Sequence, residues 1–290
     1  MYNVNMPELP ELEVVREVLQ HRVVGQIISA VEVIPPGGPI VVRDLTHRGF
    51  AAALSGATIA EVTRRGKFLV FSLHTEQKPL FLVVNPKLTG RLQLSAPSEK
   101  RLAKTHVVLA LANGRQLRYR DQKQMGQLYL TQDLHDVPDY ASLGPEPLDI
   151  TLEEFRARLK LFRGEIKGVL TRGGCVAGIG NAYADEILWA ARLHPYRKRT
   201  QLTANEVERL YAAMRDTLQA SIEKVRAEMG EAIDLEPREF FAVHRKTGKP
   251  CPRCGTPISL VGANQRITNF CRTCQPGGLI KGVGEQLSEI

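Results

Sequence analysis

The sequence predicts an α+β protein of several domains, in which a β-rich part comes first, a helical part follows and a cysteine-rich unit ends the fold. Three observations support this order: short β-rich runs between residues 26 and 132, helical patterns from residue 151 onward, and two cysteine pairs after residue 250. The chain has 290 residues, of which 43% are hydrophobic and 24% are charged, a composition typical of globular proteins. This length predicts about two domains.

The first predicted element is a helix over residues 11–22, because apolar residues recur there at helical spacing behind Pro10. Seven short β-rich runs follow, and Asn113-Gly114 between the fifth and sixth is a strong hairpin-turn signal. The runs cover residues 27–34, 58–62, 68–73, 80–84, 106–111, 117–120 and 128–130. Short strands at such close spacing predict an antiparallel sandwich or barrel.

The second half of the chain is predicted to be helical. Capping boxes at Thr151 with Glu154 and at Thr203 with Glu206 mark two helix starts. After residue 203 one apolar stripe predicts a long amphipathic helix packed on a core. Its members are Val207, Leu210, Tyr211, Met214, Leu218, Ile222 and Val225.

A glycine-containing turn, residues 176–180, precedes a further helical run. Glycines at a helix start leave backbone N–H groups free, so the turn could hold a phosphate, or it could serve the backbone geometry alone. A dinucleotide-binding fold is not predicted, because no βαβ unit flanks the turn.

The strongest single signal is the pair of motifs Cys251-x2-Cys254 and Cys271-x2-Cys274. Four thiolates at this spacing can surround one tetrahedral Zn²⁺, and they leave no open coordination position. The sequence therefore predicts one structural Zn²⁺ per chain. Redox dithiols or disulfides are the alternatives, which a cytosolic location disfavours. Cys175 is expected to be a small buried hydrophobe.

The chain is basic, with 39 Lys and Arg against 31 Asp and Glu, a formal net charge of +8. Such a charge attracts nucleic acid, although a basic soluble protein without that partner is the alternative. Residues 258–261 and 267–270 can form a hairpin that presents Arg266 to a DNA groove, or simply a solvated basic face. Basic residues near the cysteines are Arg238, Arg245, Lys246, Lys249, Arg253, Arg266 and Arg272.

No run of 18 or more apolar residues is present, so no membrane span or membrane partner is predicted. Residues 1–5 have neither a basic start nor an apolar core and do not read as a secretory signal. We therefore expect a cytoplasmic protein.

Six motifs occur in a fixed order: MPELPE at 6–11, RRGK at 64–67, LGPEPL at 143–148, GIGNAYADEI at 178–187, HP at 194–195 and QRxTxxCxxCQ at 265–275. With this set the chain resembles, over residues 6–276, the bacterial formamidopyrimidine-DNA glycosylase family, which removes oxidised purines such as 8-oxoguanine. The resemblance implies base-excision repair of damaged double-stranded DNA, by glycosylase and AP-lyase activities. It also implies a monomer that associates with the nucleoid through DNA.

The resemblance implies the domain order as well. A catalytic β-sandwich domain with a leading helix would cover residues 6–135, and a linker residues 136–150. A helix–two-turn–helix DNA-binding domain would cover residues 151–245, a zinc finger residues 246–276 and a tail residues 277–290. DNA would lie in the cleft between the two larger domains.

In the family, the nucleophile is the amine of an N-terminal proline, and the matching residue is Pro7. Attack by this amine on the sugar C1′ gives a cationic iminium, an electron sink for β- and then δ-elimination of the phosphates. Glu8 matches the residue that does acid–base work on the sugar ring oxygen, and Glu11 is expected to support the site. Lys67 matches the lysine at the lesion phosphate, and Arg266 the arginine of the zinc hairpin.

Further DNA contacts are implied in the helical domain. Asn181 matches the residue that grips phosphates beside the extruded nucleotide, together with the hairpin arginine. Tyr183 is expected to pack on or contact the glycine turn. Lys167 falls at a basic position that faces DNA in relatives.

Two segments that would fill the gap left by a flipped base depart from the family pattern. Leu88 stands where the family typically has methionine, and residues 121–126 replace an Asp-Pro-Arg-Arg-Phe-Gly segment. Leu88 and Met125 are apolar side chains that can still wedge between bases. Lys123 lacks the planar fork of the arginine it replaces, so the resemblance leaves the opposite-base preference open.

Two further departures from the family pattern lie in residues 225–243 and at the N-terminus. Residues 225–243 lack the Gly-rich loop that covers 8-oxoguanine in relatives, so the resemblance leaves open a shift of the lesion preference toward formamidopyrimidines or other oxidised bases. Residues 1–5 precede Met6, and while they are attached the Pro7 nitrogen is an amide that cannot attack C1′. We expect translation to start at Met6; a native extension would abolish Schiff-base chemistry or require processing.

Two other functions compete with the enzyme. One is a protein that binds damaged or abasic DNA on the same scaffold without catalysis. The other is a zinc-ribbon module for nucleic-acid binding or regulation without a repair role.

Overall fold

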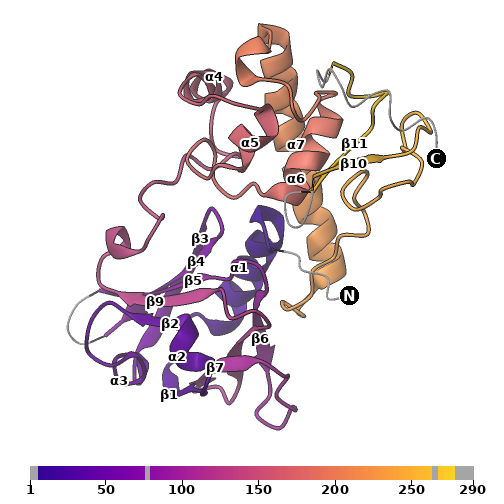
Figure 1. Cartoon of the computed structure of the whole chain (residues 1–290). Helices are drawn as coiled ribbons and strands as arrows, with labels where there is room; N and C mark the ends of the chain where they lie inside the picture. Colours follow the sequence, from indigo (N-terminus) through magenta and orange to yellow (C-terminus); the bar gives the residue numbers. More distant parts are fainter. Residues whose placement is uncertain (1–5, 76–78, 263–266, 278–290) are drawn as a thin grey trace. The chain divides into compact units, whose positions relative to one another are not determined.

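Figure 1 shows the computed structural model of the chain, which describes residues 6–75, 79–262 and 267–277. Arg266, which the sequence analysis assigns to the site, lies outside the described residues, as do residues 1–5 and 278–290. Within the described part, no helix combines the length and the apolar character needed to cross a lipid bilayer.

The chain forms two compact units. Unit 1 extends to Leu143 and also takes in Ser221–Arg238, whereas unit 2 comprises Gly144–Ala220 and the residues from Glu239 onward. The boundary near residue 143 falls inside the predicted linker of residues 136–150. The proposed helical domain of residues 151–245 is divided differently, because 221–238 belongs to the same unit as the N-terminal helix.

Unit 1 contains two separate β-sheets, with strand orders β1-β7-β8-β6 and β2-β9-β5-β4-β3. The strands are β1 (Ile28–Val33), β2 (Val42–Asp44), β3 (Thr58–Arg65), β4 (Phe68–His74), β5 (Leu80–Asn85), β6 (Gly90–Ser95), β7 (Thr105–Leu111), β8 (Gln116–Asp121) and β9 (Gln127–Thr131). Neighbouring strands in these sheets are antiparallel, except that β2 runs parallel to β9. Two sheets favour the sandwich over the barrel, with one parallel exception.

The seven predicted strands are all present, and Asn113-Gly114 forms the turn between β7 and β8, with Gly114 at a φ of 80°. Strands β2 and β6 were not predicted. β2 has only three residues, and β6 offers only Leu92 and Leu94 as apolar residues. Both lie at sheet edges, so they form because a neighbouring strand pairs with them and not because of a local pattern. The short helices α2 (Gly38–Val41) and α3 (Phe50–Leu54) were also missed.

The leading helix, α1 (Leu9–Val23), starts two residues before the predicted range. Glu8 is its N-cap and forms a capping box with Glu11, while Pro10 occupies the first turn. Glutamate is not among the usual N-cap residues, which is why the pattern alone did not mark this start. One face of α1 is buried, and it includes Leu9, Leu12, Val15, Leu19 and Val23.

The helices of unit 2 follow a stretch of turns over residues 137–151, after the short 3₁₀ helix η1 (Leu134–Asp136). They are α4 (Leu152–Lys160), α5 (Ile166–Thr171), α6 (Asn181–Ala190), the 3₁₀ helix η2 (Arg199–Gln201) and α7 (Ala204–Met229). Both predicted capping boxes are confirmed: the backbone N–H groups of Thr151 and Thr203 donate to Glu154 and Glu206 at 2.8 Å.

Helix α7 continues from unit 2 into unit 1 at residue 221. Most of its predicted stripe is buried, whereas Val207 and Tyr211 are half-buried. The buried members are Leu210, Met214, Leu218, Ile222 and Val225. Farther along, β10 (Ser259–Val261) and β11 (Thr268–Phe270) form the predicted antiparallel hairpin.

Candidate functional site

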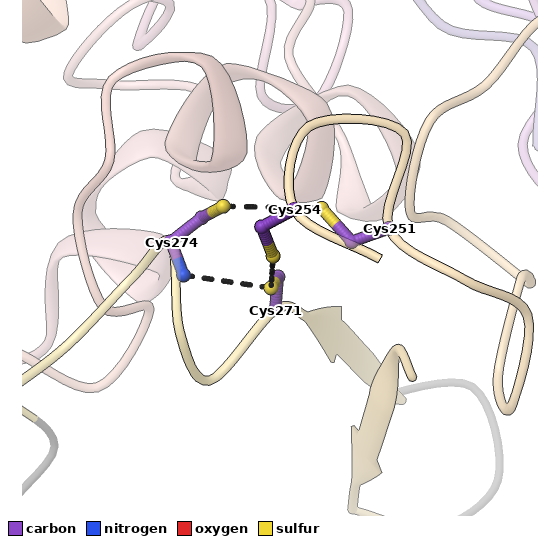
Figure 2. Close-up of side chains that lie close together, drawn as sticks. All are labelled: Cys251, Cys254, Cys271 and Cys274. Atoms are coloured by element: carbon purple, nitrogen blue, oxygen red, sulfur yellow. Dashed lines mark hydrogen bonds between the residues drawn. The ribbon is translucent and has the colours of Figure 1, made fainter. Parts of the chain in front are cut away.

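The four cysteines near the C-terminus form one cluster, in which the sulfur atoms all lie within 4.8 Å of one another (Figure 2). Cys254 and Cys271 have their sulfurs 3.4 Å apart, and Cys251 and Cys274 3.9 Å. A disulfide would require about 2.05 Å, whereas tetrahedral Zn–S bonds of 2.3 Å place the sulfurs about 3.8 Å apart. The cluster therefore fits a closed, four-thiolate zinc site.

Helix α6 contacts this cluster through Trp189, the single tryptophan of the chain. The indole N–H of Trp189 donates a hydrogen bond to the sulfur of Cys251 at 3.4 Å. The guanidinium of Arg253 stacks 4.1 Å above the indole ring and also donates to the Trp189 carbonyl. Such contacts orient metal ligands, so the cysteine cluster and α6 form one packed body within unit 2.

A second group of candidate residues surrounds the start of α1 in unit 1. Pro7, Glu8 and Glu11 are all buried. The backbone N–H of Glu8 donates to Glu11 Oε2 at 2.9 Å, and Arg238 Nε donates to Glu11 Oε1 at 3.0 Å. Glu11 thus stabilises the first turn of α1. Burial and these bonds fit the predicted supporting role and leave little of Glu11 for a contact with DNA.

Arg238 was not identified as a residue of this site. By its sequence position Arg238 is one of the basic residues near the cysteines, whereas in the structure it belongs to unit 1 and contacts α1. Its Nη2 donates to the Met6 carbonyl oxygen at 2.6 Å and forms an ion pair with Glu236 at 3.1 Å. Glu236 is paired in turn with Arg91 on β6 at 2.5 Å. Apart from the Arg238–Glu236 pair, these contacts join residues that are 145 to 232 positions apart in sequence, so no local motif signals them.

Lys67 follows the tight turn at Gly66, which has a φ of 57°, between β3 and β4. It is half-buried, and its ammonium lies 3.6 Å from the sulfur of Met6. Burial lowers the pKa of Lys67 by removing water from the ammonium, the nearby Glu8 carboxylate raises it, and Arg238 lowers it further. These interactions put Lys67 in the same group as Glu8 and Arg238, as the sequence predicts for Lys67 and Glu8.

The two proposed gap-filling segments are joined by one buried carboxylate. Asp121, at the end of β8, accepts hydrogen bonds from the Thr89 hydroxyl and from the backbone N–H groups of Lys123, at 3.1 Å, and Gly126, at 2.7 Å. Lys123 and Met125 are exposed and Leu88 is half-buried. Exposure fits side chains that are available to DNA, and Asp121 is the residue that holds both turns.

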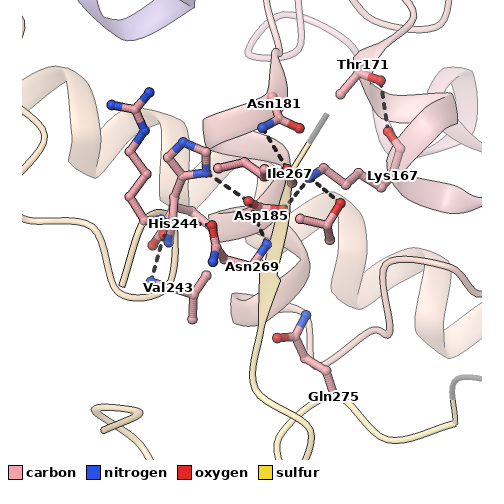
Figure 3. A network of polar contacts seen from close by, with 12 residues as sticks. Lys167, Thr171, Asn181, Asp185, Val243, His244, Ile267, Asn269 and Gln275 are labelled. Atoms are coloured by element: carbon pink, nitrogen blue, oxygen red, sulfur yellow. Dashed lines mark hydrogen bonds and ion pairs between the residues drawn. The ribbon is translucent and has the colours of Figure 1, made fainter. Parts of the chain in front are cut away.

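Figure 3 shows a buried polar network in unit 2, centred on Asp185 of α6. Asp185 pairs with Lys167 at 2.6 Å and with His244 Nδ1 at 2.8 Å, and it accepts the backbone N–H of Asn269 at 3.1 Å. Lys167 is only 7% exposed. Its ammonium is held inside unit 2, which does not fit the predicted contact with DNA.

The same network holds the start of β11. The side-chain N–H₂ of Asn181 and the ammonium of Lys167 both donate to the Ile267 carbonyl oxygen, at 2.9 and 3.0 Å. Ile267 directly follows Arg266 in the sequence, so the two side chains anchor the chain next to that arginine. Asn181 is half-buried at the first position of α6, after the predicted glycine turn.

Tyr183 is fully buried and packs edge-on against Phe241, with ring centroids 5.1 Å apart. It fits the packing role and not a direct contact with DNA. Nearby, the Glu186 carboxylate accepts backbone N–H groups of Ala242, Val243 and His244 at 2.7 to 2.9 Å. Burial raises the pKa of Glu186, and these hydrogen bonds oppose the rise. These hydrogen bonds attach residues 242–244, which precede the zinc finger, to α6.

Models of three protein domains match successive parts of the chain. The formamidopyrimidine-DNA glycosylase N-terminal domain matches residues 6–128, and the H2TH domain of the same enzymes matches residues 143–230. A zinc finger found in FPG and IleRS matches residues 248–277. Sheets, helices and a four-cysteine finger in this order define a base-excision DNA glycosylase with one structural zinc.

Individual relatives identify the family within this class of DNA glycosylases. The chain is 40% identical to a formamidopyrimidine-DNA glycosylase of Symbiobacterium thermophilum, over 93% of this chain and 90% of the relative. It is 37% identical to the enzyme of Herpetosiphon aurantiacus, over 93% and 100%. The chain therefore belongs to the formamidopyrimidine-DNA glycosylase family, a family of DNA glycosylases and AP lyases.

Solved structures agree with this assignment. Lactococcus lactis Fpg in complex with DNA that contains an abasic site matches with a TM-score of 0.80 and 31% identity, over 93% of this chain and all of that one. MutM in complex with DNA that contains carbocyclic 8-oxo-G matches with a TM-score of 0.80 and 32% identity, over the same shares.

Proposed function

We propose that this protein removes oxidised purines, 8-oxoguanine and formamidopyrimidines, from double-stranded DNA and cleaves the strand, with Pro7 as the nucleophile. The observation that carries the proposal is the group formed by buried Pro7 and Glu8 at the N-terminus of α1 with Lys67 beside them. The names of the relatives, and the damaged and abasic DNA held by similar structures, support the same substrate class.

In the proposed reaction, the Pro7 nitrogen bonds to C1′ as the glycosidic bond breaks, and the base leaves with the bonding electron pair and the proton of the amine. The C1′–O4′ bond then opens, Glu8 gives its proton to O4′, and the nitrogen lone pair forms the iminium. Loss of a C2′ proton expels the 3′ phosphate, and loss of a C4′ proton expels the 5′ phosphate. Lys67 would bind the phosphate at the lesion.

The other candidates have DNA-holding or positioning roles in this proposal. Asn181 and Arg266 would grip the phosphates beside the flipped nucleotide, and Lys167 would set the position of the Arg266 segment through the Ile267 carbonyl. Leu88 and Met125 would fill the gap in the stack, with Lys123 beside the opposite base. The closed zinc site would maintain the hairpin and take no part in chemistry.

Pro7 can act only as a free amine, so the chain must begin there. The family match starts at residue 6, one residue before Pro7, which supports a start at Met6 followed by methionine removal. The intact mass of the native protein measures this directly. A mature chain that begins at Met1 would leave only the alternative of a non-catalytic protein that binds damaged DNA.

The proposal is tested by borohydride trapping on a duplex with one abasic site. The form that begins at Pro7 should give a covalent adduct, and peptide mass spectrometry should locate it at Pro7. The 290-residue form should give none, because its Pro7 nitrogen is an amide. Failure of the Pro7 form to trap would refute the enzymatic mechanism.

A further inference from the structure

We propose that Arg238 keeps the Pro7 amine in its unprotonated, nucleophilic form by holding a guanidinium beside that nitrogen. This inference rests on the proposed role of Pro7 as the nucleophile. It gives a functional role to residues 221–238, the segment that lies between the two parts of unit 2 in sequence yet belongs to unit 1.

The guanidinium of Arg238 lies close to the Pro7 nitrogen. Arg238 Nη2 donates to the Met6 carbonyl oxygen at 2.6 Å. The oxygen and nitrogen of one peptide group are about 2.2 Å apart, so this end of the guanidinium lies within about 5 Å of the Pro7 nitrogen. A fixed cation at such a distance disfavours protonation of an amine.

Two carboxylates hold the Arg238 side chain in place. Arg238 has its Nε bonded to Glu11 at 3.0 Å and its Nη2 paired with Glu236 at 3.1 Å. Neither contact involves Met6, so both survive removal of the residues before Pro7. The Arg238 side chain is only 9% exposed, and a planar guanidinium held by two carboxylates has little freedom to turn away.

The charge of Arg238 is part of a local balance around the start of α1. The charged groups facing the start of α1 come from several elements of unit 1: Glu8 and Glu11 on α1, Lys67 after the β3–β4 turn, Arg91 on β6, and Glu236 and Arg238 in residues 221–238. Arg238 and Arg91 together offset Glu11 and Glu236. Removing the charge of Arg238 leaves one uncompensated carboxylate, which would favour the protonated amine.

The test measures the rate of single-turnover adduct formation on an abasic duplex with cyanoborohydride, from pH 5.5 to 9.5, using the form that begins at Pro7. The abasic substrate separates imine formation from base excision. In Arg238→Gln, the midpoint of the acidic limb should rise by about one pH unit, so that the rate below the midpoint falls about tenfold. At the alkaline end the variant and the wild-type protein should react equally fast.

Two variants serve as controls. Arg238→Lys retains the charge, so its midpoint should stay near that of the wild-type protein. Arg226→Gln removes another arginine that ties α7 to α1, through Glu17 at 2.8 Å. Glu17 is ten residues, or about 15 Å, along the helix from Pro7, so this change should leave the profile unmoved. Affinity for a duplex with a tetrahydrofuran abasic analogue should be the same in all forms.

The possible outcomes distinguish an effect of Arg238 on the Pro7 amine from a purely structural role. A shifted midpoint in Arg238→Gln that lysine restores supports the proposal. An equal loss of rate at every pH, or a lysine variant that behaves like the glutamine variant, would assign Arg238 a structural role only. Absence of any wild-type adduct at Pro7 would overturn the proposed function together with this inference.

Discussion

Both units bury a network of charged side chains, and the two networks differ in what surrounds the central groups. In unit 2, Asp185 is buried among Lys167, His244 and a backbone N–H group. In unit 1, burial lowers the pKa of Lys67, and the carboxylates of Glu8 and Glu11 offset this effect only in part.

We infer that the network in unit 2 stabilises the fold, whereas the network in unit 1 surrounds the residues proposed to react. Buried charged groups whose ion pairs and hydrogen bonds are all satisfied make the surrounding structure more rigid. Charges that lack full compensation have shifted pKa values, which is characteristic of active sites. We therefore expect changes in unit 2 to affect stability or metal binding first, and changes at the start of α1 to affect the reaction first.

The largest effect is expected at the cysteine cluster. Cys254→Ser should lose the zinc, because three thiolates bind it far less tightly and structural zinc contributes on the order of 10 kcal/mol in finger peptides. Zinc content per chain measures the loss, and Trp189 fluorescence should change with it, since its indole contacts Cys251. Cys175→Ala, outside the cluster, should retain the metal. A full complement of zinc in Cys254→Ser would contradict the four-thiolate site.

Glu8→Gln should come next and should act on the reaction. Loss of the proton donor for O4′ should reduce base excision by about 10³-fold, while affinity for damaged DNA is kept. Stability should fall by only about 1 kcal/mol, the value of a helix cap. Glu17→Gln on the same helix should excise normally, and normal excision by Glu8→Gln would refute the acid–base role.

Asp185→Asn should act on stability instead. It leaves the buried ammonium of Lys167 without its carboxylate, which costs about 3 kcal/mol or more. Denaturant unfolding should show this loss, whereas Asp216→Asn, at an exposed position of α7, should show almost none. Adding Lys167→Met to Asp185→Asn should restore part of the stability. A double variant as unstable as the single one would argue against the ion pair.

The smallest effect is a pH-dependent one at Lys67. Because its pKa is lower in the folded protein than in the unfolded chain, the charged lysine lowers the free energy of unfolding at neutral pH, and this cost disappears as the pH rises toward 10.5. Lys67→Met should therefore be slightly more stable than the wild-type protein at pH 7, and equally stable near pH 10.5. Exposed Lys123→Met is the control. A stability difference that grows with pH would have the wrong sign.

Much of the fold could be predicted because its signals are local. The strands of unit 1 carry enough apolar residues to be recognised one at a time, and the threonine capping boxes mark α4 and α7 within four residues. β2 and β6 escaped because they are edge strands whose formation depends on a partner. The candidate site was predicted through motifs, and its supporting residues, Asp121 and Arg238, were not, because their contacts join distant segments.

The amino-acid sequence by itself determined the zinc ligands, since two CxxC pairs bring four thiolates together over 24 residues. It also determined the family, and its motifs identified Pro7, Glu8 and Lys67 as candidate residues for the reaction. Only the tertiary structure decided that Lys167 is buried against Asp185 and that Arg238 belongs beside α1. The reason is physical: burial and pairing of a charge depend on which distant segments pack around it, and side-chain type alone does not specify them.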